Sequence, residues 1–163
     1  MNKYFVPDVT VDSIDDLSGA FFKEKGIKAV FLDIDNTLVT PKTRKPDERA
    51  NKFLNSLKEA GISVCLVSNN KKERVDEFNE GGYLSIHRAG KPFTYSYRRM
   101  LKRLKIDKNE AAAVGDQFYS DIYAGRRLGV LTVYVKPIEI GNEGPFVHLK
   151  RKLEKRIIKK LGL

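Results

Sequence analysis

Short apolar runs alternate with helical patterns along most of this chain, and this alternation restricts the fold more than any other feature of the sequence. The runs have the length of buried strands. Strands that alternate with helices in this way form a parallel sheet with helices packed on both faces. We therefore predict an α/β fold of three layers, α/β/α, with a mainly parallel central sheet. The predicted strands are 28–32, 63–67, 84–86, 111–114 and 130–135.

Helices are predicted between these strands. The first begins at Pro46-Asp47-Glu48, a typical helix start, and Gly61 ends it. The second covers 72–79 and the fourth covers 119–128. The third opens at Lys91-Pro92, and its apolar stripe consists of Phe93, Tyr97, Leu101 and Leu104.

Polar residues follow the predicted strands at the points where the strands end. Right-handed crossovers place the carboxyl ends of parallel strands along one edge of the sheet, and ligands bind at that edge in open α/β sheets. We therefore expect a single site there, although its residues come from distant parts of the chain. They are Asp33 and Asp35, Ser68-Asn69-Asn70, Ala89-Gly90-Lys91, and Gly115-Asp116.

Asp33 and Asp35 are the strongest candidates for chemistry. Two carboxylates two residues apart at the end of a strand leave the backbone on the same side. In phosphoryl transfer, one of them can attack phosphorus while the other moves the proton of the leaving group. We predict that Asp33 is the nucleophile, which forms an aspartyl-phosphate, and that Asp35 is the general acid and base. A turn or a helix cap is the alternative interpretation when this pair stands alone.

Asp116 and Asp121, together with Asp33, predict a metal site. Oxygen ligands without His or Cys nearby favour a hard cation, and Mg²⁺ is the natural occupant. Zinc is disfavoured for lack of nitrogen or sulfur ligands. Asp121 has an alternative role as a cap of the fourth helix. At neighbouring strand ends, the hydroxyl of Ser68 is expected to hold a phosphate oxygen. The ammonium group of Lys91 is expected to pair either with phosphate or with the carboxylate of the nucleophile.

The composition limits the class of protein. A chain of 163 residues forms one domain and buries a substantial core. No apolar run is long enough to span a membrane and no signal peptide is evident, so we expect a cytoplasmic protein. Cys65 is the only cysteine, which excludes an intrachain disulfide and favours a core position. The net charge of +10 implies attraction to anions such as phosphate substrates, anionic lipid or nucleic acid.

Basic charge is concentrated at the C-terminus. Residues 146–163 contain seven Lys or Arg residues and one Glu, and apolar residues recur there at helical spacing. We expect residues 1–145 to form the core domain and 146–163 a basic amphipathic helix, packed on that core or appended to it. Either the apolar stripe packs on the sheet, or the helix lies on an anionic bilayer and attaches the protein peripherally to the inner face of the membrane. The stripe consists of Phe146, Leu149, Leu153, Ile157 and Leu161.

Four segments in chain order resemble the motifs of the haloacid dehalogenase (HAD) superfamily of phosphatases. The closer resemblance is to subfamily IIIA and its YqeG-like branch, which is similar to mitochondrial phosphatidylglycerophosphate phosphatases. The resemblance implies a Rossmannoid, HAD-like fold. The segments are Asp33-Ile34-Asp35-Asn36-Thr37-Leu38-Val39, Val67-Ser68-Asn69-Asn70, Gly90-Lys91-Pro92, and Gly115-Asp116 through Asp121.

The resemblance also implies a role for each matching residue. Asp33 would be the nucleophile and a metal ligand, and Asp116 a second ligand of Mg²⁺. Asp35 would be the acid and base, with its backbone carbonyl on the metal, and Asp121 would support the site. The implied phosphate-binding residues are Thr37, Ser68, Asn69 and Lys91.

The segments between the motifs are too short for the cap domains that choose substrates in this superfamily. Only 30 residues separate Thr37 from Ser68, and 22 separate Ser68 from Lys91. We therefore expect an open site without a cap domain. Such a site suits a phosphate on a large substrate, or closure by a membrane or by another subunit of an oligomer.

The resulting hypothesis is a Mg²⁺-dependent phosphomonoester hydrolase, and the resemblance implies that it converts phosphatidylglycerophosphate to phosphatidylglycerol. A polynucleotide or small-molecule phosphatase is one alternative, although the basic tail lacks the interleaved aromatic residues that stack on bases. A nucleic-acid or ribosome-binding module on the same scaffold is another, although a binding module has no need of Asp35.

Overall fold

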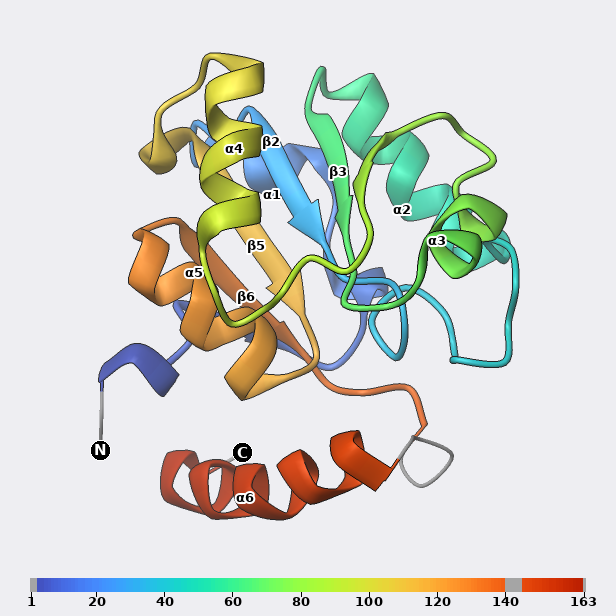
Figure 1. Cartoon of the computed structure of the whole chain (residues 1–163). Helices are drawn as coiled ribbons and strands as arrows, with labels where there is room; N and C mark the ends of the chain where they lie inside the picture. Colours follow the sequence, from blue (N-terminus) through green and yellow to red (C-terminus); the bar gives the residue numbers. More distant parts are fainter. Residues whose placement is uncertain (1–2, 140–144, 163) are drawn as a thin grey trace.

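The protein folds around a six-stranded sheet in which neighbouring strands are parallel (Figure 1). The structure, a computed structural model, describes residues 3–139 and 145–162. The strand order is β1-β6-β5-β2-β3-β4, which confirms the predicted α/β class. The strands are β1 (Val9–Val11), β2 (Ala29–Leu32), β3 (Ser63–Val67), β4 (Leu84–Ile86), β5 (Ala111–Gly115) and β6 (Leu131–Val135).

Helices cover both faces of the sheet, because side chains alternate along each buried strand. In β2, Val30 and Leu32 join the core formed with α1, α2 and α3. Phe31, between them, packs on the opposite side with α4 and α5. The predicted three layers are therefore confirmed. The helices of these layers are α1 (Gly19–Glu24), α2 (Glu48–Glu59), α3 (Lys72–Phe78), α4 (Tyr95–Leu104) and α5 (Tyr123–Leu128).

Some predicted elements differ from the observed ones. The third predicted helix begins at Tyr95, not at Lys91. The amide of Phe93 donates to the carbonyl of Gly90 in a turn, and the Phe93 side chain is 71% exposed, so its place in the apolar stripe was wrong. The fourth predicted helix is divided into a π-helix, η4 (Phe118–Ile122), and α5. The sequence analysis did not predict β1 and α1, which are three and six residues long and carry at most a weak periodic signal.

The connections between the strands leave no cap domain. Between Thr37 and Ser68 the chain forms α2 and β3, and between Ser68 and Lys91 it forms α3 and β4. No inserted domain therefore covers the carboxyl edge of the sheet within this part of the chain, as predicted. Cys65 is fully buried, also as predicted, and burial raises the pKa of its thiol to about 12.

The C-terminal helix, α6 (Pro145–Leu161), lies beside the carboxyl edge of the sheet (Figure 1). Ile157 and Ile158 are half-buried and pack against a cluster that includes Phe118 and Tyr134, whereas Leu149 is 57% exposed. Part of the helix is therefore packed on the core. Within the described residues, no helix is both long and apolar enough to cross a membrane. Three side chains of the predicted stripe lie outside the described residues, those of Phe146, Leu153 and Leu161.

Candidate active site

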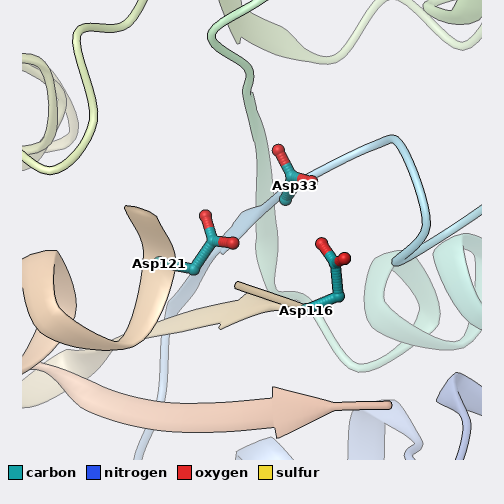
Figure 2. Close-up of side chains that lie close together, drawn as sticks. All are labelled: Asp33, Asp116 and Asp121. Atoms are coloured by element: carbon teal, nitrogen blue, oxygen red, sulfur yellow. The ribbon is translucent and has the colours of Figure 1, made fainter. Parts of the chain in front are cut away.

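Three aspartate carboxylates converge at the carboxyl edge of the sheet (Figure 2). Asp33 directly follows β2, Asp116 directly follows β5, and Asp121 lies in η4. One carboxylate oxygen of each lies within 4.8 Å of the others, and all three residues are buried. We call these residues the acidic cluster. Parallel topology predicted that Asp33 and Asp116 would meet, and Asp121, expected to support the site, belongs to the same cluster.

Gly115, the last residue of β5, makes room for Asp121. A Cβ atom at Gly115 would lie 2.3 Å from Cγ of Asp121, which is closer than non-bonded atoms approach. The Asp121 carboxylate also accepts a hydrogen bond from the amide of Gln117 at 3.1 Å. Asp121 therefore accepts from the amide of the residue that precedes η4 and also belongs to the acidic cluster, but it is not the N-cap of η4 or of α5.

Lys91 places a positive charge against the acidic cluster. Its ammonium nitrogen lies 2.6 Å from Oδ1 of Asp33 and 2.6 Å from Oδ1 of Asp121. The Lys91 side chain is 3% exposed, so salt and water screen these ion pairs weakly. The Asn69 side chain fixes the Lys91 backbone, because it accepts from the Lys91 amide at 2.8 Å and donates to the Lys91 carbonyl at 3.0 Å. Lys91 thus contacts the predicted nucleophile, and Asn69 positions Lys91.

Burial is the main influence on the pKa values of the three carboxyl groups. It raises the pKa of Asp33, with Lys91 opposing the shift, and it raises the pKa of Asp116 well above its usual value, with Arg151 opposing. It raises the pKa of Asp121 to about 6, again against Lys91. Burial alone would lower the pKa of Lys91, but the charges of Asp121 and Asp33 outweigh burial and hold that pKa well above its usual value. Perturbed groups gathered in this way are typical of functional sites.

Asp116 is held from two sides. The Thr37 hydroxyl donates to Oδ1 of Asp116 at 3.1 Å. The other carboxylate oxygen forms an ion pair with Arg151 of α6, and Nη1 of Arg151 donates to the backbone carbonyl of Asp116 at 2.7 Å. The hydroxyl of Thr37, which was expected to bind phosphate, is therefore hydrogen-bonded to Asp116 of the acidic cluster in this structure.

Asp35 does not belong to the acidic cluster and is paired with Arg74 of α3. Nε and Nη2 of Arg74 donate to Oδ1 of Asp35 at 3.1 and 2.6 Å, and the side chain of Asn70 donates to Oδ2. The hydroxyl of Ser68, which is buried, accepts from the Asn70 amide at 3.1 Å. The segment after β3 therefore forms a local turn, and Asn70 in this turn helps to orient Asp35.

Sequence reasoning missed three residues that touch the site: Arg74, Arg151 and Glu154, the ion-pair partner of Arg151. The available signals were weak. Arg74 lies four residues after Asn70, near the start of the helix that follows the second motif, and Arg151 and Glu154 stand in a run of charged residues. A charged residue in a helical pattern gives no sign of whether it faces water or a distant carboxylate.

The donor set of the acidic cluster fits a hard divalent cation. The cluster offers only carboxylate oxygens, with no His or Cys among its members. Such oxygens suit Mg²⁺, which completes its shell with water and phosphate oxygens. Among the described residues, two cations, Lys91 and Arg151, form ion pairs with these three carboxylates, so negative charge is in excess. The arrangement can therefore hold a cation and a phosphate group beside Asp33.

Known proteins with similar sequences are hydrolases and phosphatases. The haloacid dehalogenase-like hydrolase family matches residues 42–129. The chain is 32% identical to the probable phosphatase YqeG of Bacillus subtilis (strain 168), over 99% of this chain and 94% of that protein. It is 27% identical to the chloroplastic/mitochondrial phosphatidylglycerophosphate phosphatase 1 of Arabidopsis thaliana, over 97% of this chain and 48% of that protein. The resemblance that the motifs indicated is therefore confirmed.

A solved structure shares the fold. It is the 3-deoxy-D-manno-octulosonate 8-phosphate phosphatase of Moraxella catarrhalis, in complex with magnesium ion, phosphate ion and KDO. The TM-score is 0.53, with 84% of this chain and 91% of that chain covered and 16% identity. At this identity the likeness concerns the fold alone, and it agrees with the predicted HAD-like architecture.

Proposed function

Because the chain belongs to the haloacid dehalogenase-like hydrolases, we propose that it is a Mg²⁺-dependent phosphomonoester hydrolase with Asp33 as its nucleophile. The observation that carries this proposal is the burial of Asp33 against Lys91, Asp116 and Asp121. A carboxylate at the end of a buried strand, with a cation and further carboxylates around it, has the groups needed to bind and attack a phosphate.

In the first proposed step, a carboxylate oxygen of Asp33 attacks the phosphorus atom of the substrate. The bond between phosphorus and the ester oxygen breaks, and protonated Asp35 donates its proton to that oxygen. The alcohol product leaves, and the phosphoryl group stays on Asp33 as an acyl phosphate. Arg74 and Asn70 hold the Asp35 carboxyl in one orientation during the transfer.

In the second proposed step, the Asp35 carboxylate accepts a proton from a water molecule, and the water oxygen attacks phosphorus. The bond between phosphorus and Asp33 breaks, inorganic phosphate leaves, and both carboxyl groups return to their starting states.

The proposed ligands of Mg²⁺ are Asp33, Asp116 and the backbone carbonyl of Asp35, with Asp121 as a supporting residue. The ion would supply positive charge that offsets the repulsion between a carboxylate and a phosphate. The proposed phosphate-binding residues are Thr37, Ser68, Asn69 and Lys91.

For the substrate, we propose a phosphorylated glycerolipid such as phosphatidylglycerophosphate. The similarity to the Arabidopsis thaliana phosphatidylglycerophosphate phosphatase covers 97% of this chain and supports this choice. The chain between Thr37 and Lys91 contains no cap domain, so no inserted domain stands between a bulky lipid and the carboxyl edge of the sheet.

We propose further that α6 attaches the protein peripherally to an anionic membrane surface, at the inner face of the membrane. The helix would contact lipid through its charges, because Ile157 and Ile158 pack on the core. Each basic residue near such a surface contributes roughly 1 kcal/mol to binding. Among the described side chains of α6, the exposed basic residues are Lys152, Lys155, Arg156, Lys159 and Lys160.

The reaction is tested by release of inorganic phosphate from phosphatidylglycerophosphate in vesicles with Mg²⁺. Asp33→Asn should lower the rate by a factor of about 10³ or more, because the amide is a poor nucleophile. The matched control is Asp12→Asn, which removes a surface carboxylate paired with Lys136 and should leave the rate unchanged. A rate in Asp33→Asn equal to that of the wild type would refute the proposed nucleophile.

Membrane attachment is tested by co-sedimentation with vesicles. Vesicles rich in phosphatidylglycerol should bind the wild type, and vesicles of phosphatidylcholine should not. The double variant Lys155→Glu/Lys159→Glu should lose this binding, whereas Lys102→Glu/Lys105→Glu, at the exposed end of α4, should keep it. Equal binding by the two double variants would reject α6 as the contact surface.

The same basic surface of α6 favours a second candidate substrate, the phosphorylated end of a nucleic acid. Faster hydrolysis of a 3′-phosphorylated oligonucleotide than of the lipid would select a polynucleotide phosphatase. Preference for a small phosphomonoester would select a small-molecule phosphatase. Nucleic-acid binding without hydrolysis of any of these esters, unchanged by Asp35→Ala, would select a binding module.

A further inference from the structure

We propose that α6 is part of the active site and that Arg151 is a positioning residue, which holds Asp116 in the orientation that binds Mg²⁺. This inference rests on the proposed function, because Asp116 is there a ligand of the ion. It assigns a role to the C-terminal helix that membrane attachment does not require.

The contacts of Arg151 restrain both the backbone and the side chain of Asp116. One guanidinium nitrogen pairs with Oδ2 of the carboxylate, and the other donates to the Asp116 carbonyl at 2.7 Å. Thr37 donates to Oδ1 at 3.1 Å. Because a guanidinium is planar and its donors are fixed relative to one another, these contacts together define the plane of the carboxylate.

Burial separates Arg151 and Glu154 from the other charged residues described on α6. Arg151 is 6% exposed and Glu154 is 0% exposed. Lys155 and Arg156, which follow on the same helix, are exposed. Removing two charges from water costs about as much free energy as their pairing returns, so a buried ion pair adds little net stability. A contribution to stability therefore does not readily explain why this buried ion pair is present. Orientation of the Asp116 side chain explains it directly.

Glu154 links the same helix to the other part of the acidic cluster. Its Oε2 accepts from Arg151 at 3.3 Å, and its Oε1 accepts from the Tyr119 amide at 3.2 Å. Tyr119 lies in η4, the element that carries Asp121. One ion pair on α6 thus contacts Asp116 directly and fixes the backbone near Asp121.

The packing of α6 supports this arrangement. Ile157 and Ile158 lie one turn beyond Glu154 and pack against the cluster that includes Phe118, in η4. The helix is therefore seated on the segment that supplies the acidic cluster, and it brings Arg151 to Asp116. Partners that orient a metal ligand commonly change metal affinity 10- to 100-fold when they are removed.

The experiment is calorimetric titration of Mg²⁺ into the full chain, which needs no substrate. Arg151→Gln should weaken Mg²⁺ binding by roughly 10- to 100-fold. Arg151→Lys keeps the charge and loses the planar fork, so its affinity should fall between those of the wild type and Arg151→Gln. The matched control, Arg156→Gln, removes an exposed arginine of the same helix and should bind Mg²⁺ like the wild type.

Hydrolysis of p-nitrophenyl phosphate adds a second measurement. The Mg²⁺ concentration for half-maximal rate should rise in Arg151→Gln, while KM at saturating Mg²⁺ should stay near the wild-type value. A defect that only destabilises the fold would lower the amount of active protein and leave the Mg²⁺ requirement unchanged.

Unchanged or tighter Mg²⁺ binding by Arg151→Gln would overturn the inference, since Arg151 would then have no effect on Mg²⁺ affinity or would lower it. Should Arg151→Gln not fold, Arg151→Lys decides the matter by the same criterion. The wild-type measurements separate the two proposals. If the wild type hydrolyses phosphomonoesters and Arg151→Gln binds Mg²⁺ as tightly as the wild type, only the inference about Arg151 is refuted. If the wild type binds no Mg²⁺, both that inference and the proposed Mg²⁺-dependent function are refuted.

Discussion

Arg74 donates from both Nε and Nη2 to the same oxygen of Asp35, at 3.1 and 2.6 Å. The side chains are 11% and 18% exposed, so the pair is largely shielded from water. Nη2 also donates to the carbonyl of Thr43 at 2.9 Å. Arg74 therefore links Asp35, the predicted general acid and base, to the loop around Thr43, which follows Asp35 in the chain.

Arg74→Gln should lower kcat about 10- to 100-fold with a smaller effect on KM, because Asp35 loses its orientation rather than its chemistry. The measurement is steady-state hydrolysis of p-nitrophenyl phosphate, with the thermal midpoint recorded alongside. Lys72→Gln is the matched control, since Lys72 lies on the same helix in an exposed ion pair with Asp76. Equal kcat values in the two variants would argue against a positioning role for Arg74.

Lys91→Met should destabilise the metal-free protein by about 3–5 kcal/mol, because it leaves the buried carboxylates of Asp33 and Asp121 without their cation. Saturating Mg²⁺ should reduce this loss, since the ion replaces part of the missing charge. Urea unfolding in EDTA and in Mg²⁺ measures both values. Lys28→Met, which breaks an exposed ion pair with Glu110, should cost far less, because solvent screens that pair. A loss that Mg²⁺ does not change would mean that the ion binds elsewhere.

Gly115→Ala should displace the Asp121 side chain, because the new Cβ would lie 2.3 Å from Cγ of Asp121. We expect a cost of about 1–3 kcal/mol in unfolding free energy together with a clear loss of kcat. Gly125→Ala offers a matched steric control away from the acidic cluster, with its Cβ 2.6 Å from Cγ2 of Thr132. This control should be destabilised without a comparable loss of kcat. If Gly115→Ala and Gly125→Ala had similar kcat values, catalysis would tolerate movement of Asp121.

The stability of the metal-free protein should fall as the pH rises through about 6, because burial raises the pKa of Asp121 to about 6 while Lys91 opposes that shift. The folded state holds this proton more tightly than the unfolded chain, in which the carboxyl titrates near pH 4. The stabilisation is therefore complete below about pH 4 and is lost between about pH 4 and 6.

Thermal midpoints in EDTA test this dependence. Between about pH 5 and pH 7 the midpoint of the wild type should decrease more than that of Asp121→Asn, whose amide does not titrate. Mg²⁺ requires deprotonated carboxylates, so the rise in midpoint on adding Mg²⁺ should be larger at about pH 7 than at about pH 5. Parallel curves for the wild type and the variant would contradict the assigned pKa direction.

The parallel sheet and much of the site were predictable because they depend on local pattern and on topology. Apolar runs identified five of the six strands. Once the strands were parallel, Asp33 and Asp116, which directly follow β2 and β5, had to lie along one edge. Lys91, five residues beyond the end of β4, was expected near the same edge. Family motifs then supplied roles for these residues, and the family itself is confirmed.

Other features had no local signal. Phe93 looked like part of an apolar stripe and is exposed in a turn, since Asn69 and the acidic cluster hold Lys91 before the helix begins. Arg74 looked like any charged residue of an amphipathic helix, and it meets Asp35, which lies 39 residues earlier in the chain.

The sequence by itself determined the parallel α/β sheet, the edge at which the site forms and the acidic residues that follow its strands. Only the tertiary structure decided which cations meet those acids, and above all that Arg151, among the many basic residues of α6, is buried against Asp116. The physical reason is that strand and helix periods are properties of neighbouring residues. The burial of a charge and the identity of its partner depend on groups brought together from distant parts of the chain.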